Sequence, residues 1–156
     1  MVANDPKRLP KLTRGARFPS PAPEGRLSNQ PKSGAVLFAK DLPRVAKFYE
    51  ELLAMTVSVS EPDHIVLEST EFQLVVHAIP KKVAKSIKIT SPPVHRTEVP
   101  TKLFFPVASL AETRVKAAAL GGALNPKNKE WEARAFRACD GHDPEGNVVQ
   151  FRENAL

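Results

Sequence analysis

The sequence lacks most of the features that mark membrane, secreted or metal-cluster proteins. Only one of its 156 residues, Cys139, is a cysteine, so no internal disulfide and no cysteine-based metal site can form. No stretch approaches the roughly 18 consecutive apolar residues of a membrane span. The N-terminus is basic, but no apolar segment of a secretory signal follows it. We therefore expect a protein of a reducing compartment, the cytoplasm.

Motifs for nucleotide and zinc-protease chemistry are also missing, because the sequence has no phosphate loop, dinucleotide fingerprint or zincin pattern. The pair Gly121-Gly122 follows a helical pattern and ends it. Aromatic residues make up 6% of the chain, and Phe18 is the only one in the first 33 residues. A single-strand nucleic-acid surface needs interleaved aromatic side chains, so this N-terminal stretch does not resemble one.

Positive charge is concentrated at the N-terminus. Residues 1–33 hold seven Lys/Arg against two Asp/Glu, and six of the fifteen prolines, whereas the other 123 residues hold 16 basic and 15 acidic residues. Prolines prevent a helix, and the few apolar residues cannot offset the entropy of ordering. We interpret residues 1–33 as a solvated basic, Pro-rich arm. An anion- or nucleic-acid-binding arm and an organelle-targeting peptide are the alternatives.

Periodic patterns replace this composition from residue 34 onward. Residues 35–39 form an apolar run typical of a buried strand. Asp41 is placed to cap a helix that has Pro43 in its first turn and continues to about Ala54. Three further strands are predicted over residues 56–60, 64–67 and 72–79.

The same order of elements appears a second time. A buried strand is predicted over residues 102–107, and Ser109 and Glu112 form a capping box that begins a second helix. Strand candidates follow at residues 123–125, 135–139 and 147–152. Aligning the caps Asp41 and Ser109 gives an offset of 68 residues at which strand falls on strand. The sequence therefore predicts two repeated modules, each of one helix and four strands.

The two modules are separated by a segment that breaks the pattern. Residues 81–101 contain four lysines and three prolines. We interpret them as a crossover between module one, about 34–80, and module two, about 102–154. Residues 87–90 are a candidate short edge strand, where lysines protect against edge pairing.

Two sequence motifs lie at the ends of this repeat. The first begins at Gly34 and continues with Val36, Phe38, Asp41-Leu42 and Phe48-Tyr49-Glu50-x-Leu52-Leu53; the second is Asp143-Pro144-Glu145-Gly146-Asn147-Val148-Val149-Gln150-Phe151. Together they resemble the glyoxalase/bleomycin-resistance/dioxygenase superfamily, also called vicinal oxygen chelate proteins, over roughly residues 34–154. The resemblance implies an α+β fold of two tandem βαβββ modules whose curved mixed sheets form a ligand cleft, commonly completed by a homodimer.

Metal-dependent members of that superfamily take one metal ligand from each of four strands. The resemblance places these positions at Gly34 and Lys102 on the first strand of each module and at Gln150 on the last strand. The first-module counterpart of Gln150 is Gln73 or, with a shift of two residues, Val75. A glycine has no donor, a protonated lysine repels a cation, and two neutral amides do not make a site without His or carboxylate. We therefore predict no metal cofactor.

Side chains that share strand parity with these positions, or lie on nearby loops, are the candidate ligand contacts. They are Phe38, Gln73, His77, Lys102, Phe104, Trp131, His142, Gln150 and Arg152. Structural alternatives remain for His77, an exposed or packed histidine, for His142, a loop hydrogen bond, and for Trp131, packing on the sheet or on a dimer partner. We expect Cys139 to be a small buried residue rather than a nucleophile.

Two classes of function follow from these residues. The first is a metal-free small-molecule-binding protein, in the manner of the superfamily's antibiotic-sequestering members, with an anionic or aromatic ligand favoured by the apolar pocket and by Lys102 and Arg152. The second is a metal-dependent lyase, isomerase or dioxygenase with an atypical site, against which the missing ligands argue. A metal-free enzyme using His77, Lys102 or His142 is a third alternative. We expect a homodimer with no membrane or nucleic-acid partner.

Overall fold

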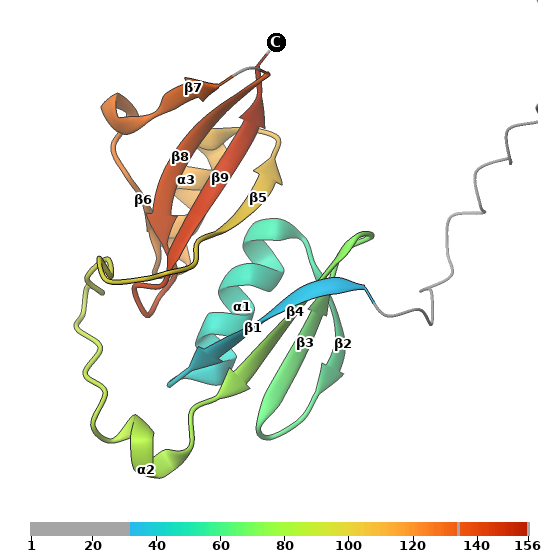
Figure 1. Ribbon diagram of the computed structural model, residues 1–156, viewed down its shortest axis with the longest axis vertical. Helices are drawn as coiled ribbons and strands as arrows, with labels where there is room; N and C mark the ends of the chain where they lie inside the picture. The colour runs from blue at the N-terminus through green and yellow to red at the C-terminus, as the bar shows by residue number, and fades with distance from the viewer. Residues whose placement is uncertain (1–31, 134, 156) are drawn as a thin grey trace, which may run out of the picture. The chain divides into compact units, whose positions relative to one another are not determined.

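Two mixed β-sheets, each covered on one face by a helix, make up the computed structural model of the chain, which describes residues 32–133 and 135–155 (Figure 1). The predicted α+β fold of two successive modules is confirmed. The interpretation of residues 1–33 as an arm falls on residues that, up to 31, lie outside the described ones. No helix of the described residues is long and apolar enough to cross a membrane.

The first module forms a four-stranded sheet, sheet A, with strand order β1-β4-β3-β2. Strand β1 is parallel to β4, and the other neighbours are antiparallel. The elements match the predicted ones closely, and β1 begins one residue before the predicted start of the module. They are β1 (Ser33–Ala39), α1 (Leu42–Leu53), β2 (Thr56–Ser60), β3 (His64–Glu68) and β4 (Phe72–Ala78).

The second module repeats this arrangement as sheet B, with strand order β5-β9-β8-β6. A short strand that the sequence did not predict, β7, pairs with β8, and β8 continues three residues past the predicted strand end at Cys139. Gly121 adopts a φ of 86° after the second helix, which confirms its role as a helix stop. The elements are β5 (Leu103–Val107), α3 (Leu110–Ala119), β6 (Ala123–Leu124), the 3₁₀ turn η1 (Lys127–Lys129), β7 (Trp131–Ala133), β8 (Phe136–His142) and β9 (Val148–Asn154).

The crossover contains one short helix, α2 (Lys81–Ala84), and no strand. The edge strand expected over residues 87–90 was therefore a wrong prediction. The carbonyl of Ile87 accepts a hydrogen bond from Lys40 Nζ, at 2.6 Å, instead of joining a ladder. The prolines at 92 and 93 then remove the backbone donors that an extended ladder would need.

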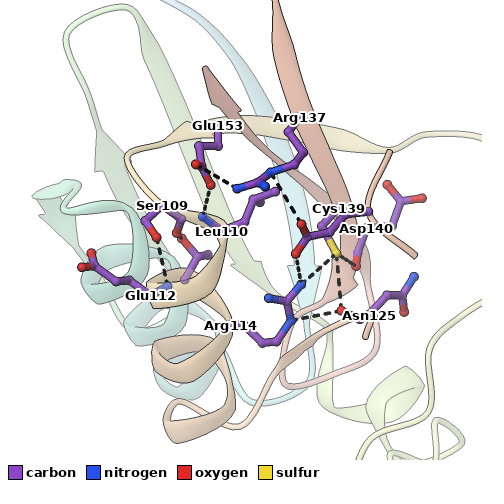
Figure 2. Close-up of polar contacts among 11 residues, drawn as sticks. Ser109, Leu110, Glu112, Arg114, Asn125, Arg137, Cys139, Asp140 and Glu153 are labelled. Atoms are coloured by element: carbon purple, nitrogen blue, oxygen red, sulfur yellow. Dashed lines mark hydrogen bonds and ion pairs between the residues drawn. The ribbon is translucent and has the colours of Figure 1, made fainter. Parts of the chain in front are cut away.

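Helices α1 and α3 begin as the sequence predicts. At the start of each, backbone amides also donate to a carboxylate from a distant strand or turn. The Asp41 side chain accepts from Arg44 N at 3.2 Å, and that of Ser109 accepts from Glu112 N at 3.3 Å. In place of the second half of a capping box, Leu110 N donates to Glu153 Oε2 of β9 at 2.7 Å (Figure 2).

The two modules share one hydrophobic core. Tyr49 of α1 stacks at an angle against Phe105 of β5, with ring centroids 6.1 Å apart, and Phe105 meets Phe72 of β4 edge-on at 5.8 Å. Strand alternation turns every second residue toward this core. On β4, Leu74 and Val76 are buried, whereas the alternating Gln73, Val75 and His77 face away from the helix.

Candidate functional site

The face of each sheet that is turned away from its helix, here called the free face, carries the predicted ligand contacts. Its apolar side chains are well exposed, at 57% for Phe38 and 55% for Phe104, whereas the alternating neighbour Phe105 is 8% exposed. A free face of this composition, with aromatic rings among a few polar groups, is typical of a surface that receives a ligand or a partner.

The strand register decides which residue of β4 corresponds to Gln150. Gln150 lies opposite Phe104, and at the 68-residue offset Phe104 corresponds to Val36, which lies opposite Val75. The counterpart of Gln150 is therefore Val75, one of the two residues that the sequence left open. Gln73 lies two residues earlier, opposite Gly34.

On sheet B, a carboxylate that the sequence analysis missed organises the free face. Asp140 of β8 accepts from Lys102 Nζ at 2.8 Å and from Gln150 Nε2 at 2.9 Å. Burial raises the pKa of Asp140, but the hydrogen bonds from Lys102 and Gln150 outweigh it and hold the pKa below its usual range. The positive charge of Lys102, predicted to meet an anionic ligand, is thus neutralised within the protein.

Sheet A contains an analogous group of a lysine, a carboxylate and a glutamine. Glu68 of β3 accepts from Lys32 Nζ at 2.8 Å, and from Gln73 Nε2 and Ser58 Oγ at 3.0 Å each. These hydrogen bonds, that of Lys32 first, lower the pKa of Glu68. In each module, therefore, a lysine and a glutamine of the free face both donate to one carboxylate, and the lysine forms an internal ion pair with it.

Next to the Asp140 group, Arg152 of β9 stacks on aromatic rings. Its guanidinium carbon lies 3.6 Å from the centroid of the Phe104 ring and 4.7 Å from that of Phe136. Arg152 Nε donates to Gln150 Oε1 at 2.7 Å. Trp131, which is 43% exposed, meets Phe136 edge-on at 5.9 Å. The structure thus brings together five of the predicted contacts on sheet B, namely Lys102, Phe104, Trp131, Gln150 and Arg152.

The predicted histidines lie on the free faces but make local contacts. His77 stacks beside His64 at 6.0 Å and against Phe38 at 5.7 Å, and its Nδ1 donates to the carbonyl of Ala78. His142 Nδ1 donates to the carbonyl of Asp143 at 2.9 Å, the loop hydrogen bond that was its structural alternative. The ring centroids of His142 and of His95 in the crossover are 5.7 Å apart. The pKa of His95 is lowered, first by its burial and second by the neighbouring His142.

The C-terminal sequence motif is structural in this chain. Asp143, fully buried, accepts from the backbone amides of Glu145 and Asn147, from the Asn147 side chain and from Tyr49 Oη. Glu145 accepts from Lys40 N at 2.9 Å and from Asp41 N at 2.6 Å. The motif therefore fixes the β8–β9 turn and joins it to the start of α1.

Cys139 lies on the opposite face of sheet B, against α3 (Figure 2). Its Sγ donates to the carbonyl of Asn125 at 3.4 Å and accepts from Arg114 Nη2 at 3.6 Å. Burial raises the pKa of the thiol despite the arginine. Arg114 and Arg137 both pair with the nearly buried Glu130. A buried, protonated thiol agrees with the structural interpretation of this cysteine.

A pocket of about 280 Å³ lies between the end of α1 and the start of α3. Its lining includes Leu52, Pro106, Thr113 and Lys116. Pro106 shares strand parity with Phe104, but none of the nine candidate ligand contacts named from the sequence lines this pocket. Across residues 32–133 and 135–155 no three His, Cys, Asp or Glu side chains are grouped so that they could hold a metal ion.

Comparison with known proteins places this architecture in one family. The family model for the glyoxalase-like domain matches residues 34–151, so the chain belongs to this family and, through it, to the vicinal oxygen chelate superfamily. The resemblance stated from the two motifs is confirmed. No curated protein sequence matches the chain.

Solved structures share the fold at low sequence identity. A glyoxalase/bleomycin resistance protein/dioxygenase family enzyme from Burkholderia phytofirmans is 17% identical, with a TM-score of 0.60 over 79% of this chain and 98% of that chain. The bleomycin resistance determinant encoded on transposon Tn5 is 16% identical, with a TM-score of 0.50 over 81% and 100%. A mutant fosfomycin resistance protein from Listeria monocytogenes, complexed with Mn(II) and 1S,2S-dihydroxypropylphosphonic acid, is 12% identical, with a TM-score of 0.56 over 83% and 95%.

Proposed function

We propose that this chain is a small-molecule-binding member of its superfamily that works without a bound metal and takes an anionic or aromatic ligand on its free faces. The observation that carries the proposal is the Lys102–Asp140–Gln150 group, which places an internal ion pair where the resemblance locates metal ligands. Exposed Phe104 and Trp131 on sheet B, and Phe38 on sheet A, supply apolar contact area on the free faces.

The residues present do not fit a divalent metal. Lys102 brings a positive charge to its position, and Val75 offers no donor atom. The amide oxygen of Gln150 already accepts from Arg152. At Gly34, a Cβ atom would lie 2.3 Å from the carbonyl oxygen of Gln73, so this position does not accept a ligating side chain without a backbone shift. We therefore assign no step of chemistry to a metal.

The alternative is a metal-dependent lyase, isomerase or dioxygenase with an atypical site. It is favoured by the similarity to the Listeria protein, which was crystallised with Mn(II). Elemental analysis of the purified protein separates the two. We expect no stoichiometric metal, and tightly held iron, manganese, nickel or zinc at one ion per chain would overturn the metal-free proposal.

Native mass spectrometry of the gently purified protein tests ligand binding itself. We expect a non-covalent organic molecule, released on denaturation, that competes with added ligand for the free faces. A protein that carries no small molecule and binds none from a library of aromatic and anionic compounds would contradict the proposal.

We also propose a homodimer, because exposed rings on both sheets leave apolar area uncovered. A stable two-fold interface buries on the order of 1,000 Å² or more. Light scattering should then give twice the chain mass of 17.1 kDa. A monomer at micromolar concentration would argue against a ligand site shared between two copies. We further propose that the protein acts in the cytoplasm, without a membrane or nucleic-acid partner.

A further inference from the structure

The free face of sheet B carries a cation, Arg152, that no acidic side chain among residues 32–133 and 135–155 neutralises. Lys102 is paired with Asp140, whereas Arg152 makes an ion pair with no acidic side chain of the described residues. Its one hydrogen bond to a described residue leaves from Nε toward the neutral Gln150 amide. A half-buried guanidinium without a counterion favours an anion beside it.

The contacts of Arg152 define how an anion can approach. The face of the guanidinium is occupied by Phe104, at 3.6 Å from the ring centroid, and by Phe136 at 4.7 Å. The Nε–H is engaged by Gln150, a residue that is itself only 4% exposed. The terminal Nη groups, for which the described residues provide no hydrogen-bond partner, are therefore the donors left for a ligand. They form a flat fork whose geometry matches two oxygens of one carboxylate.

Apolar surface continues from this fork in two directions. Phe104 is 55% exposed and Trp131 is 43% exposed, and Phe136 links Trp131 to Arg152. Trp131 and Arg152 lie opposite the same residue, Ala138, from the two neighbouring strands. A ligand whose carboxylate meets Arg152 would thus rest its body on one of these rings.

We propose that Arg152, and not Lys102, holds the anionic group of the ligand, and that the ligand class is an aromatic or otherwise flat apolar carboxylate. This inference rests on the proposed function and names the chemistry of its site. Lys102 then serves a different purpose, since its pairing with Asp140 keeps Gln150 oriented toward Arg152.

Benzoate and its neutral analogue benzamide test the inference on the full chain. Binding is followed by NMR, through the indole N–H of Trp131, the single tryptophan, and the Nε–H of Arg152. We expect benzoate to bind about tenfold or more tightly than benzamide, because a charge-assisted bidentate contact is lost with the amide. Arg152→Gln should abolish this preference, and Arg152→Lys should keep a weaker preference, which shows that a misfolded sheet is not the cause. Arg44→Gln, on the exposed surface of α1, is the matched control and should leave the preference intact.

Each contrary result has one meaning. Equal binding of the two probes at the Trp131 face, or a preference that survives Arg152→Gln, overturns the inference while leaving small-molecule binding in place. A preference lost in Lys102→Met but kept in Arg152→Gln assigns the anion to Lys102 and also overturns it. A change from dimer to monomer in Arg152→Gln, seen by light scattering, would show that a second copy covers this face and would also overturn the inference. If benzoate fails to bind, the inference falls, and the proposed function is then decided separately by native mass spectrometry.

Discussion

At the scale of single residues, the surroundings of two aspartates three positions apart, Asp140 and Asp143, shift their pKa values in opposite directions. Asp140 is partly exposed and accepts from the ammonium of Lys102, which stabilises the carboxylate. Asp143 is fully buried and accepts only from neutral donors, so burial raises its pKa despite four hydrogen bonds. The charge of the donor and the access of water decide the outcome, more than the number of hydrogen bonds.

Replacing Lys102 with Met should raise the pKa of Asp140 toward its ordinary value, since a charged donor is removed. An NMR titration of the Asp140 carboxyl measures this directly, with Lys88→Met as the exposed control. The lowered pKa in the folded protein contributes stability above about pH 4, the ordinary pKa of an aspartate, and this stability is lost as pH falls through the folded-state value. The variant should therefore lose less stability on acidification, by under about 1 kcal/mol for so exposed a lysine. An unchanged titration would mean that the pair does not form in solution.

At the scale of elements, both helix N-termini are completed by carboxylates from far along the chain. Glu145 accepts the amides of Lys40 and Asp41 before α1, and Glu153 accepts that of Leu110 in α3. Amides at a helix start have no partner within the helix, and a negative charge there also interacts favourably with the helix dipole. The start of each helix is therefore fixed partly by tertiary structure.

Replacing Glu145 with Gln should destabilise the fold by about 1–3 kcal/mol, because both carboxylate oxygens are used and the amide can replace only one of them. Urea denaturation followed by circular dichroism measures the change. Glu71→Gln, in the exposed β3–β4 turn, is the matched control and should change the midpoint little. Equal midpoints for the two variants would show that the contact does not contribute to stability.

At the scale of the whole chain, the question is how much of the N-terminal sequence the fold needs. Lys32 is the first described residue, and its ammonium pairs with Glu68 where both side chains are mostly buried, at 11% and 15% exposure. We predict that deleting residues 1–30, which keeps Lys32, leaves the Tm within a few degrees. Lys32→Met in the full chain should lower the Tm by more than the deletion does. Differential scanning calorimetry of the three proteins decides the matter, and a large loss on deletion would show that the arm packs on the domain.

The sequence predicted strongly periodic elements well and pairwise contacts poorly. The apolar stripe of α1 and the alternation of β4 identify their elements without outside information. Strand β7 is three residues long, too short to show a period, and was missed. Asp140 was missed because its importance depends on lying opposite Gln150, a register that becomes visible only when β8 extends past Cys139. Lys102 was singled out from its spacing, but its partner Asp140 could not be read from spacing.

The bonds from Glu145 to the start of α1 also bear on how the chain is made. On the ribosome, the helix emerges more than 100 residues before the carboxylate that completes it. Tyr49 of the same helix likewise contacts Asp143 and Phe105, two residues that are synthesised much later. Contacts of such long sequence separation form late, so the first half of the nascent chain should stay sensitive to protease until nearly the whole sequence has left the exit tunnel. The two halves would then fold together, and the first would not fold ahead of the second.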